Sequence, residues 1–404
     1  MLTLVTGFLS VVVALAAVVL LLPTASDLVS LVRLALRRDR APTQVAAKLE
    51  RFLFLVPAHN EELLIEACVR SLLDLRYPSA HATFVVIADN CTDRTAEIVR
   101  GLGVRCLERR DPVNPGKPFA IAWALQQVSL DGVDGVVIVD ADSIVHPDFA
   151  TGLAAAAPVS DKALQCYNDV SNPRENALTR MAAVFSAVRC RHINEFKRFA
   201  GLNSSLGNGL CLGTNVLRRV GWNAFSISED SELYAMLTRD GIHIESAVAA
   251  RIFSQEARSL GQSASQRRRW AAGNSLVLRR YGWQLARSER IGFAQKLDSI
   301  AELTCPGPAV HLGIVAGLCA ATFLLRLPGA PFLAAGVGFS LVRPLTYTSI
   351  AVWSDPDPTS AMLAFSFLPF YTVWRLGVQA GAVMAVGKQS WVRTERHAQP
   401  DRRS

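Results

Sequence analysis

The sequence predicts an α/β nucleotide-binding domain that is attached to a membrane by apolar segments on both sides. Three observations support this prediction. Short apolar strands alternate with helix-like segments between about residues 50 and 250, a pattern typical of parallel βαβ units. An uncharged apolar run, Leu2 to Pro23, precedes them. A second apolar region begins near Pro306 and continues almost to the end of the chain.

The composition favours a lipid bilayer over other large partners. Of the 404 residues, 50% are apolar and 19% are charged, with a net charge of +8 and a mean hydropathy of +0.25. The charged fraction lies below the roughly 25% usual in soluble domains. The excess of basic residues lies beside the apolar runs, as expected next to anionic lipid. We therefore expect no nucleic-acid partner, and the eight cysteines, which form no CxxC pair, predict no zinc site.

The first apolar run predicts a retained membrane anchor over residues 1–24. Its length is roughly 33 Å as a helix, enough for a hydrocarbon core of about 30 Å. No basic residue precedes it, whereas four arginines follow it: Arg33, Arg37, Arg38 and Arg40. By the positive-inside rule the segment after it, residues 25–49, is a basic juxtamembrane segment in the cytoplasm, and the N-terminus lies outside.

Two further crossings are expected over residues 305–354. Val310 to Leu327 and Phe332 to Trp353 are each long enough to span, and the Pro328-Gly329 turn separates them. Arg343 interrupts the second stretch, and an arginine at that depth is costly unless it faces protein or water.

The last segment, residues 355–404, predicts an interfacial or re-entrant stretch followed by a basic cytoplasmic tail. Ala361 to Val386 is apolar, but Pro369 interrupts it and Arg375 lies near its middle. The tail is basic, which favours the cytoplasm and therefore an even number of crossings after the central domain. The prediction is three crossings in total.

Polar residues gather where the predicted strands of the central domain end. His59 and Glu61 follow Phe52 to Val56, and Asp89 follows Phe84 to Ala88. Ligands of parallel sheets bind at these carboxyl ends. Asp140 and Asp142 follow the fourth strand, and their oxygens can share one divalent cation; a helix-capping turn is the alternative.

Seven motifs together resemble a known family. They are VPAHNEE (56–62), ADNCTDRT (88–95), GKPFAIAWAL (116–125), DADSIVHP (140–147), GTNVLRR (213–219), SEDSEL (228–233) and QRRRW (266–270). In this order they resemble membrane-bound family 2 glycosyltransferases of the processive-type branch, most of all bacterial exopolysaccharide transferases of the methanolan-biosynthesis type. The resemblance implies a GT-A (Rossmann-like) catalytic domain over 50–262, followed by the QxxRW motif and interfacial helices over 263–304.

The resemblance also implies a role for each motif residue. Those implied to bind the UDP-sugar donor are Pro57, His59, Glu61, Asp89, Lys117, Asp140, Asp142, Gln266, Arg269 and Trp270. Asp142, with Asp140, would hold Mg²⁺ or Mn²⁺. Asp230 would be the general base and Glu229 its positioning neighbour. Gly213 and Thr214, in the stretch 208–214, would hold the acceptor. A structural histidine at position 59 and a helix cap at Asp230 remain alternatives.

The implied activity is inverting, metal-dependent transfer of a hexose from a UDP-sugar to a membrane-associated lipid or glycan, with the catalytic domain on the cytoplasmic side of the inner membrane. Exopolysaccharide assembly is the implied pathway. The alternatives are a ceramide or glycolipid glucosyltransferase, a processive polysaccharide synthase and an inactive nucleotide-sugar-binding scaffold. The sequence leaves the oligomeric state open, a homo-oligomer included.

Overall fold

A mixed eight-stranded sheet forms the centre of the computed structural model, which describes residues 2–36 and 49–384. The strands are β1 (Phe52–Ala58), β2 (Ala82–Asp89), β3 (Arg105–Arg109), β4 (Gly135–Ile138), β5 (Ser143–Val145), β6 (Ala163–Val170), β7 (Leu210–Gly213) and β8 (Ile244–Ser254). Arg37, Arg38, Arg40 and the basic tail lie outside the described residues.

The sheet order is β3-β2-β1-β4-β7-β6-β8-β5. The first four strands in this order are parallel, which confirms the predicted βαβ units. β7 then runs antiparallel to both β4 and β6, and β5 runs antiparallel to β8. The second half of the sheet therefore departs from a purely parallel arrangement.

Helices cover both faces of the sheet, which is why β1 is apolar at successive positions. Phe52, Phe54 and Val56 pack on one face with helices α2, α3 and α5, whereas Leu53 and Leu55 pack on the other with α4, α8 and α9. These helices are α2 (Ile65–Leu73), α3 (Thr95–Gly101), α4 (Lys117–Gln127), α5 (Phe149–Ala154), α8 (Thr214–Val220) and α9 (Glu229–Arg239). A short 3-10 turn, η1 (Ser79–His81), precedes β2.

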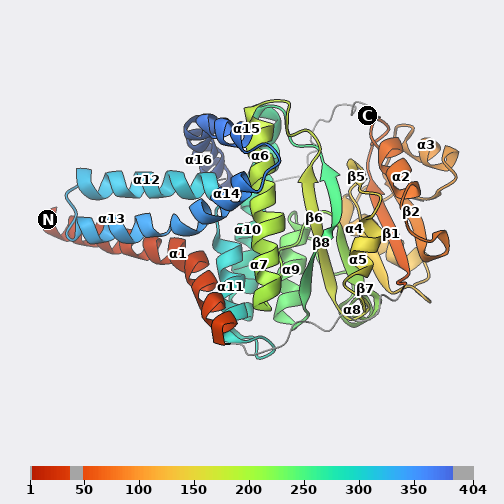
Figure 1. The fold of residues 1–404 in the computed structure, drawn as a ribbon, viewed down its shortest axis with the longest axis horizontal. Coiled ribbons are helices and arrows are strands. Elements are labelled where there is room, and N and C mark those ends of the chain that lie inside the picture. The colour runs from red at the N-terminus through yellow and green to blue at the C-terminus, as the bar shows by residue number, and fades with distance from the viewer. Residues whose placement is uncertain (1, 37–48, 385–404) are drawn as a thin grey trace.

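A second group of helices joins the sheet to the apolar segments. It contains α6 (Ala177–Ser186), the π-helix η2 (Ala187–Ile193), α7 (Asn194–Ala200), α10 (Leu260–Arg287), α11 (Phe293–Thr304), α14 (Val342–Trp353), α15 (Pro358–Ala364), the 3-10 turn η3 (Phe365–Phe367) and α16 (Leu368–Met384). In Figure 1 these helices stand between the sheet and an extended arm.

The arm consists of α1 (Leu2–Leu36), α12 (Pro308–Leu324) and α13 (Ala330–Phe339), which lie side by side in Figure 1. Val13 and Leu20 of α1 pack there against Val315 and Val337. Beyond Pro23 the same helix contacts the body of the protein, where the hydroxyl of Ser26 donates to Asp298 of α11 at 3.2 Å. The predicted anchor thus corresponds to about the first two thirds of a longer helix, Leu2–Leu36.

Two described helices are long and apolar enough to cross a membrane, Thr3–Leu36 and Pro358–Ala382. A third span results if Phe293–Thr304 and Pro308–Leu324, which meet at 82°, count as one. The stretch from Phe332 to Trp353, whose interruption near Arg343 the sequence indicates, is divided into two helices, because α13 ends at Phe339 and α14 begins at Val342. The number and direction of crossings remain predictions.

The break before α14 has a physical reason. Pro344 has no backbone N–H, so it is tolerated in the first turn of a helix but not in its interior. Arg343 beside it forms an ion pair with Asp27 of α1 at 2.9 Å. The apolar stretch therefore contains a charge that faces protein, which satisfies the condition expected from the sequence.

Candidate functional site

A cavity of about 1010 Å³ extends from the carboxyl ends of the parallel strands to the apolar helices. The predicted donor and catalytic residues all line it: Pro57, His59, Glu61, Asp89, Lys117, Asp140, Asp142, Glu229, Asp230, Gln266, Arg269 and Trp270. At its other end the lining residues include Pro308, His311, Arg343, Tyr347, Tyr371 and Arg375. The motifs thus meet in space, and their cavity continues among the apolar helices.

The loops after β1 and β2 are joined by hydrogen bonds at the end of the cavity beside the sheet. The ring of His59 bonds through Nδ1 to the carbonyl of Asp89 at 2.7 Å. The amide of Glu61 donates to Oγ1 of Thr95 at 2.8 Å. Asn60 and Asn90 both have positive φ, near 55° and 50°, which asparagine tolerates better than most residues. His59 therefore has a structural bond as well as a place in the lining.

Both carboxylate oxygens of Asp89 already accept hydrogen bonds from other residues of the protein. The side chain of Arg109 donates to its Oδ1 at 2.6 Å, and the amide of Gly116 donates to its Oδ2 at 3.1 Å. Only 3% of the residue is exposed. Gly116 directly precedes Lys117, the first residue of α4. The hydrogen bond from Gly116 to Asp89 therefore fixes the position of Lys117 at the start of this helix.

Lys117 lies among acidic residues of two other motifs. Its Nζ lies 2.8 Å from Oδ1 of Asp140 and 3.1 Å from Oε1 of Glu229. Burial alone would lower the pKa of Lys117, but the charges of Asp140, Glu229 and Asp230 outweigh it and raise the pKa well above the usual value. Lys117 is therefore a permanent cation at this end of the cavity.

Asp230 has the titration behaviour that a general base needs. Burial, with the nearby charges of Glu229 and Asp140, raises its pKa to about 7, although Lys117 and Arg189 act in the opposite direction. A pKa near the working pH suits proton transfer. The helix-cap alternative is wrong, because α9 begins at Glu229 and its N-cap is Ser228.

Asp140 and Asp142 offer carboxylate oxygens to a cation. The amide of Asp140 donates to Oδ1 of Asn208 at 3.0 Å, so the turn after β4 is fixed to the loop before β7. Within the described residues there is no group of three or more His, Cys, Asp or Glu side chains able to hold a metal. The pair fits a hard divalent ion whose other ligands come from a diphosphate or water.

The acceptor assignment of Gly213 and Thr214 is wrong. Gly213 pairs with Gly135 at the start of β4, the end of that strand remote from Asp140. A Cβ on Gly213 would lie 2.2 Å from the carbonyl oxygens of Val159 and Ser160, and Thr214 bonds the carbonyl of Val133 at 2.9 Å. Both residues are buried. Because β7 is antiparallel to β4, its beginning, near Asn208, faces the cavity instead.

The QxxRW motif lies on the long helix α10. Gln266, Arg269 and Trp270 all line the cavity, and Trp270 is 38% exposed. The guanidinium of Arg267 lies 4.9 Å from the centre of the Trp270 ring. Cationic and aromatic side chains thus lie together at the cavity wall, a combination suited to a diphosphate and a sugar.

Sequence reasoning missed Arg189 and Glu302. Arg189 lies on the π-helix η2, and π-helical turns often occur at functional sites. Its guanidinium lies 3.7 Å from Glu302 of α11, which also pairs with Lys197 at 2.8 Å. No motif signals these residues, because Arg189 comes near Asp230, and pairs with Glu302 of α11, only in the folded protein.

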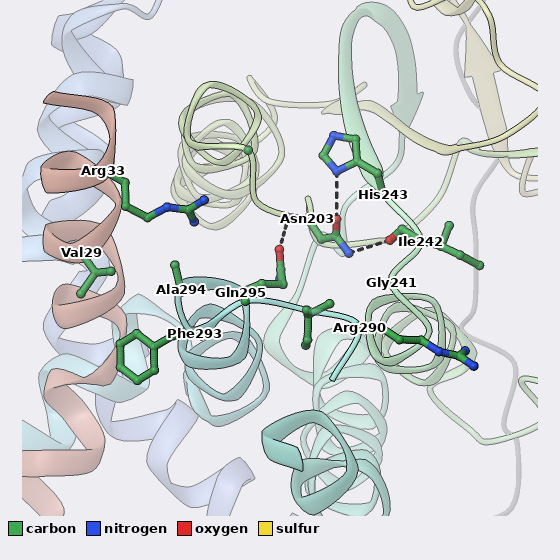
Figure 2. Close-up of a pocket in the computed structure, with 13 residues that line it drawn as sticks. Val29, Arg33, Asn203, Gly241, Ile242, His243, Arg290, Phe293, Ala294 and Gln295 are labelled. Atoms are coloured by element: carbon green, nitrogen blue, oxygen red, sulfur yellow. Dashed lines mark hydrogen bonds between the residues drawn. The ribbon is translucent and has the colours of Figure 1, made fainter. Parts of the chain in front are cut away.

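A second cavity, of about 590 Å³, lies between α1, the start of β8 and the start of α11. Figure 2 shows the hydrogen bonds of Asn203 to Gln295, Ile242 and His243 beside it. None of the predicted site residues lines this cavity. The hydrogen bonds of Asn203 join α11 to the segment before β8, so we assign this region a structural role.

Comparisons with known proteins agree with the fold and the motifs. The family described as glycosyltransferase-like family 2 matches residues 50–273. A Bacillus subtilis protein named "Probable glycosyltransferase YdaM" is 25% identical over 245 residues, which cover 58% of each chain. The beta-monoglucosyldiacylglycerol synthase of a Nostoc species is 26% identical over 256 residues, or 61% of this chain and 53% of that protein. This chain therefore matches only part of the length of these relatives.

A solved structure gives the same picture at the level of the fold. The mannosyltransferase PcManGT of Pyrobaculum calidifontis, in complex with GDP-mannose and Mn²⁺, superposes with a TM-score of 0.56 at 18% identity, covering 94% of this chain and 98% of that one. The predicted GT-A fold is thus confirmed, with a mixed sheet. Since the family match covers more than half of the chain, the protein belongs to the glycosyltransferase-like family 2.

Proposed function

We propose that this protein is an inverting hexosyltransferase that moves a sugar from a UDP-sugar to a hydroxyl group of a membrane lipid. The observation that carries the proposal is the shared cavity, which Asp142 and Asp230 line at one end and Arg343 and Tyr371 at the other. A UDP-sugar bound beside the sheet and the head group of a lipid held among the apolar helices could therefore meet in the same cavity. The name of the Nostoc relative, a glucosyldiacylglycerol synthase, supports a lipid acceptor.

In this proposal Asp230 takes the proton from the acceptor hydroxyl. The freed oxygen attacks the anomeric carbon, and the bond from that carbon to the diphosphate oxygen breaks, so one displacement inverts the configuration. Lys117 and Arg269 neutralise the charge that gathers on the departing UDP. Glu229, 3.1 Å from Lys117, positions the ammonium group.

Asp142 and Asp140 would hold Mg²⁺ or Mn²⁺ beside the diphosphate. The cation supplies neutralisation of the phosphate charge when it is bound. Asp140 shares one oxygen with Lys117 at 2.8 Å, and the motif resemblance assigns the direct bond to the cation to Asp142. The assignment of a divalent cation to this site rests on the carboxylate oxygens of the two residues, which are the ligands that such cations prefer.

The proposed location is the inner membrane, with several crossings and the catalytic domain on the cytoplasmic side. The apolar helices Thr3–Leu36 and Pro358–Ala382 support membrane attachment, and the arginines after the first run support the orientation. Exopolysaccharide assembly remains the proposed pathway, through a lipid-linked product. Two or three candidate spans leave little wall for a polymer channel, which argues against processive synthesis.

The test is turnover by the full chain in phosphatidylglycerol and phosphatidylethanolamine nanodiscs, with added lipid extract. UDP-glucose, UDP-galactose and UDP-N-acetylglucosamine would be offered in turn, with Mg²⁺ or Mn²⁺. We expect UDP release together with one new glycolipid detected by mass spectrometry, and neither from Asp230→Asn. UDP binding without turnover of any donor would support the inactive scaffold instead.

A further inference from the structure

Arg375 is a cation of the cavity for which the described residues supply no ion-pair partner. Its Nη1 atom is buried and has no hydrogen-bond partner among them. The other cations of the cavity are engaged: Lys117 with Asp140, Arg189 with Glu302, Arg267 with Glu256 and Arg343 with Asp27, and Arg269 also has interactions within the protein. An arginine left unpaired on an apolar helix is expensive and marks a functional position.

The residues around Arg375 add positive charge to this part of the cavity rather than neutralise it. α16 packs along α10, which contains three consecutive arginines. A Cβ on Gly381 of α16 would lie 3.8 Å from Nε of Arg268, and Arg375 and Arg267 are close enough to repel each other. Arg267 already faces Glu256 at 3.4 Å, so Arg375 is the guanidinium group of this pair that is left to bind an anion.

The position of Arg375 along the cavity indicates which anion this is. Asp230 lines the cavity beside the sheet, whereas Arg375 lines it from α16. Figure 1 shows α16 beside α12, on the far side of α6 and α10 from the sheet. Ala309 and Tyr371 pack in one apolar cluster and also line the cavity, and Tyr371 lies one helical turn before Arg375 on α16. A lipid whose hydroxyl reaches Asp230 and whose chains lie among the apolar helices must therefore pass Arg375 between the two.

We propose that the acceptor lipid carries a phosphate between its hydroxyl-bearing head group and its apolar chains, and that Arg375 binds this phosphate. The inference rests on the proposed function and narrows its acceptor. Two sources share this chemistry: a phosphodiester lipid with a glycerol head group, and a polyprenyl-diphosphate-linked sugar. A neutral diacylglycerol has a hydroxyl but no phosphate, so it would leave Arg375 unpaired.

The experiment compares acceptors and variants in phosphatidylcholine vesicles, whose choline head group has no hydroxyl. Phosphatidylglycerol, polyprenyl-diphosphate-glucose and dioleoylglycerol are each added as the single acceptor. The proteins are the full-length wild type, Arg375→Gln, Arg375→Lys and Arg279→Gln. Arg279 is the matched control, since it is exposed on α10 and does not line the cavity. Melting temperature and UDP affinity are measured for all four.

We expect the wild type to prefer one of the two phosphate-bearing acceptors, and the preferred one identifies the source. Arg375→Gln should raise the KM for that acceptor about tenfold or more, since a hydrogen bond to a charged group is lost, with little change in kcat or in the KM for the UDP-sugar. Arg375→Lys should recover most of the loss, and Arg279→Gln should match the wild type.

Three results would overturn the inference. The first is a wild type that prefers dioleoylglycerol, and the second is an Arg375→Gln protein with unchanged acceptor preference. The third is a rise in donor KM alone, which would assign Arg375 to the UDP-sugar. In each of these cases glycolipid still forms, so the proposed function stands. Loss of the proposed function has a different signature, namely UDP binding with no transfer to any of the three acceptors.

Discussion

The ammonium group of Lys117 lies 2.8 Å from a carboxylate oxygen of Asp140. Lys117 is the first residue of α4, and Asp140 follows β4, the strand next to β1. The pair therefore fixes the helix start against the end of the sheet. Glu229 at the start of α9 lies 3.1 Å from the same ammonium, so residues of three motifs meet at the charge of Lys117. This charge also acts on Asp230, whose pKa it lowers.

The first prediction concerns pH. Asp230 must be deprotonated to accept a proton, and its pKa is raised to about 7, so kcat/KM should rise as pH increases through about 7. Glu229→Gln removes a negative neighbour and should move this limb to lower pH. Lys117→Gln removes a positive neighbour and should move it to higher pH. The measurement is a profile of kcat/KM from pH 5 to 9, and shifts in the same direction for both variants would contradict the assignment.

The second prediction is that Asp230→Asn loses about 10² to 10⁴ in kcat, the usual contribution of a general base. Asparagine keeps the shape of the side chain, and Asp142 and Lys117 are unchanged, so UDP affinity should stay near that of the wild type. Since Asp230 lies inside α9 rather than at its cap, the melting temperature should also change little. Steady-state kinetics, UDP calorimetry and thermal unfolding check these points. Near-normal turnover by Asp230→Asn would refute the base assignment.

Much of the first half of the fold could be predicted from the sequence, whereas the second half could not. β1, β2 and β4 are buried apolar runs that end in polar residues, so both their position and their parallel pairing follow from pattern. β5 and β7 have three and four residues, too short to show a period. β6 contains Gln165 and Asn168, which line the cavity and interrupt its apolar pattern.

The dependence of the site on tertiary packing also explains which of its residues were predicted wrongly or missed. A motif gives the residues of a strand but not which end faces the ligand, and antiparallel pairing of β7 with β4 turned Gly213 away from Asp140. Arg189 and Arg375 lie outside every motif. Their importance depends on a π-helical turn and on the packing of α16 against α10, neither of which a local pattern contains.

The third prediction is that Asp142→Asn loses divalent-dependent activity while it still folds. Replacing a carboxylate by an amide removes a charged oxygen ligand that Mg²⁺ or Mn²⁺ favours. We expect a weaker apparent affinity for Mn²⁺ in activity titrations and in direct binding of Mn²⁺ with UDP, observed by electron paramagnetic resonance. Asp74→Asn, at an exposed position after α2, is the control. Full wild-type activity after exhaustive chelation would contradict the metal assignment.

The fourth prediction is that Gly213→Ala damages stability rather than acceptor binding. Its Cβ would approach two backbone carbonyl oxygens at 2.2 Å, and backbone cannot move aside as a flexible side chain can. Overpacking of this kind costs about 1–3 kcal/mol, so we expect a lower melting temperature. Acceptor KM of the folded fraction should be unchanged, and Thr214→Val should behave similarly but more mildly. A raised acceptor KM at normal stability would restore the acceptor role of this position.

The fifth prediction is that the turn between α12 and α13 lies across the membrane from the catalytic domain. Ser10 of α1 bonds the carbonyl of Pro328 in that turn at 3.2 Å, so the turn lies beside the N-terminal half of the predicted anchor. If residues 1–24 cross with their beginning outside, the turn lies toward that outer side, and we expect Leu325 to be accessible from there. Leu325 is 52% exposed and suits substitution by cysteine.

The test uses Leu325→Cys in a variant whose eight native cysteines are replaced, labelled in intact cells by a membrane-impermeant maleimide. Arg279→Cys, exposed on α10, is the matched control and should label only after the membrane is opened. We expect labelling of Leu325→Cys in closed cells, because the helices of the arm are apolar on the surfaces they expose, such as Leu15 at 63% and Phe332 at 85%. Labelling of Leu325→Cys only after lysis would mean that the arm does not cross, and that α1 and α12 instead lie along the membrane surface.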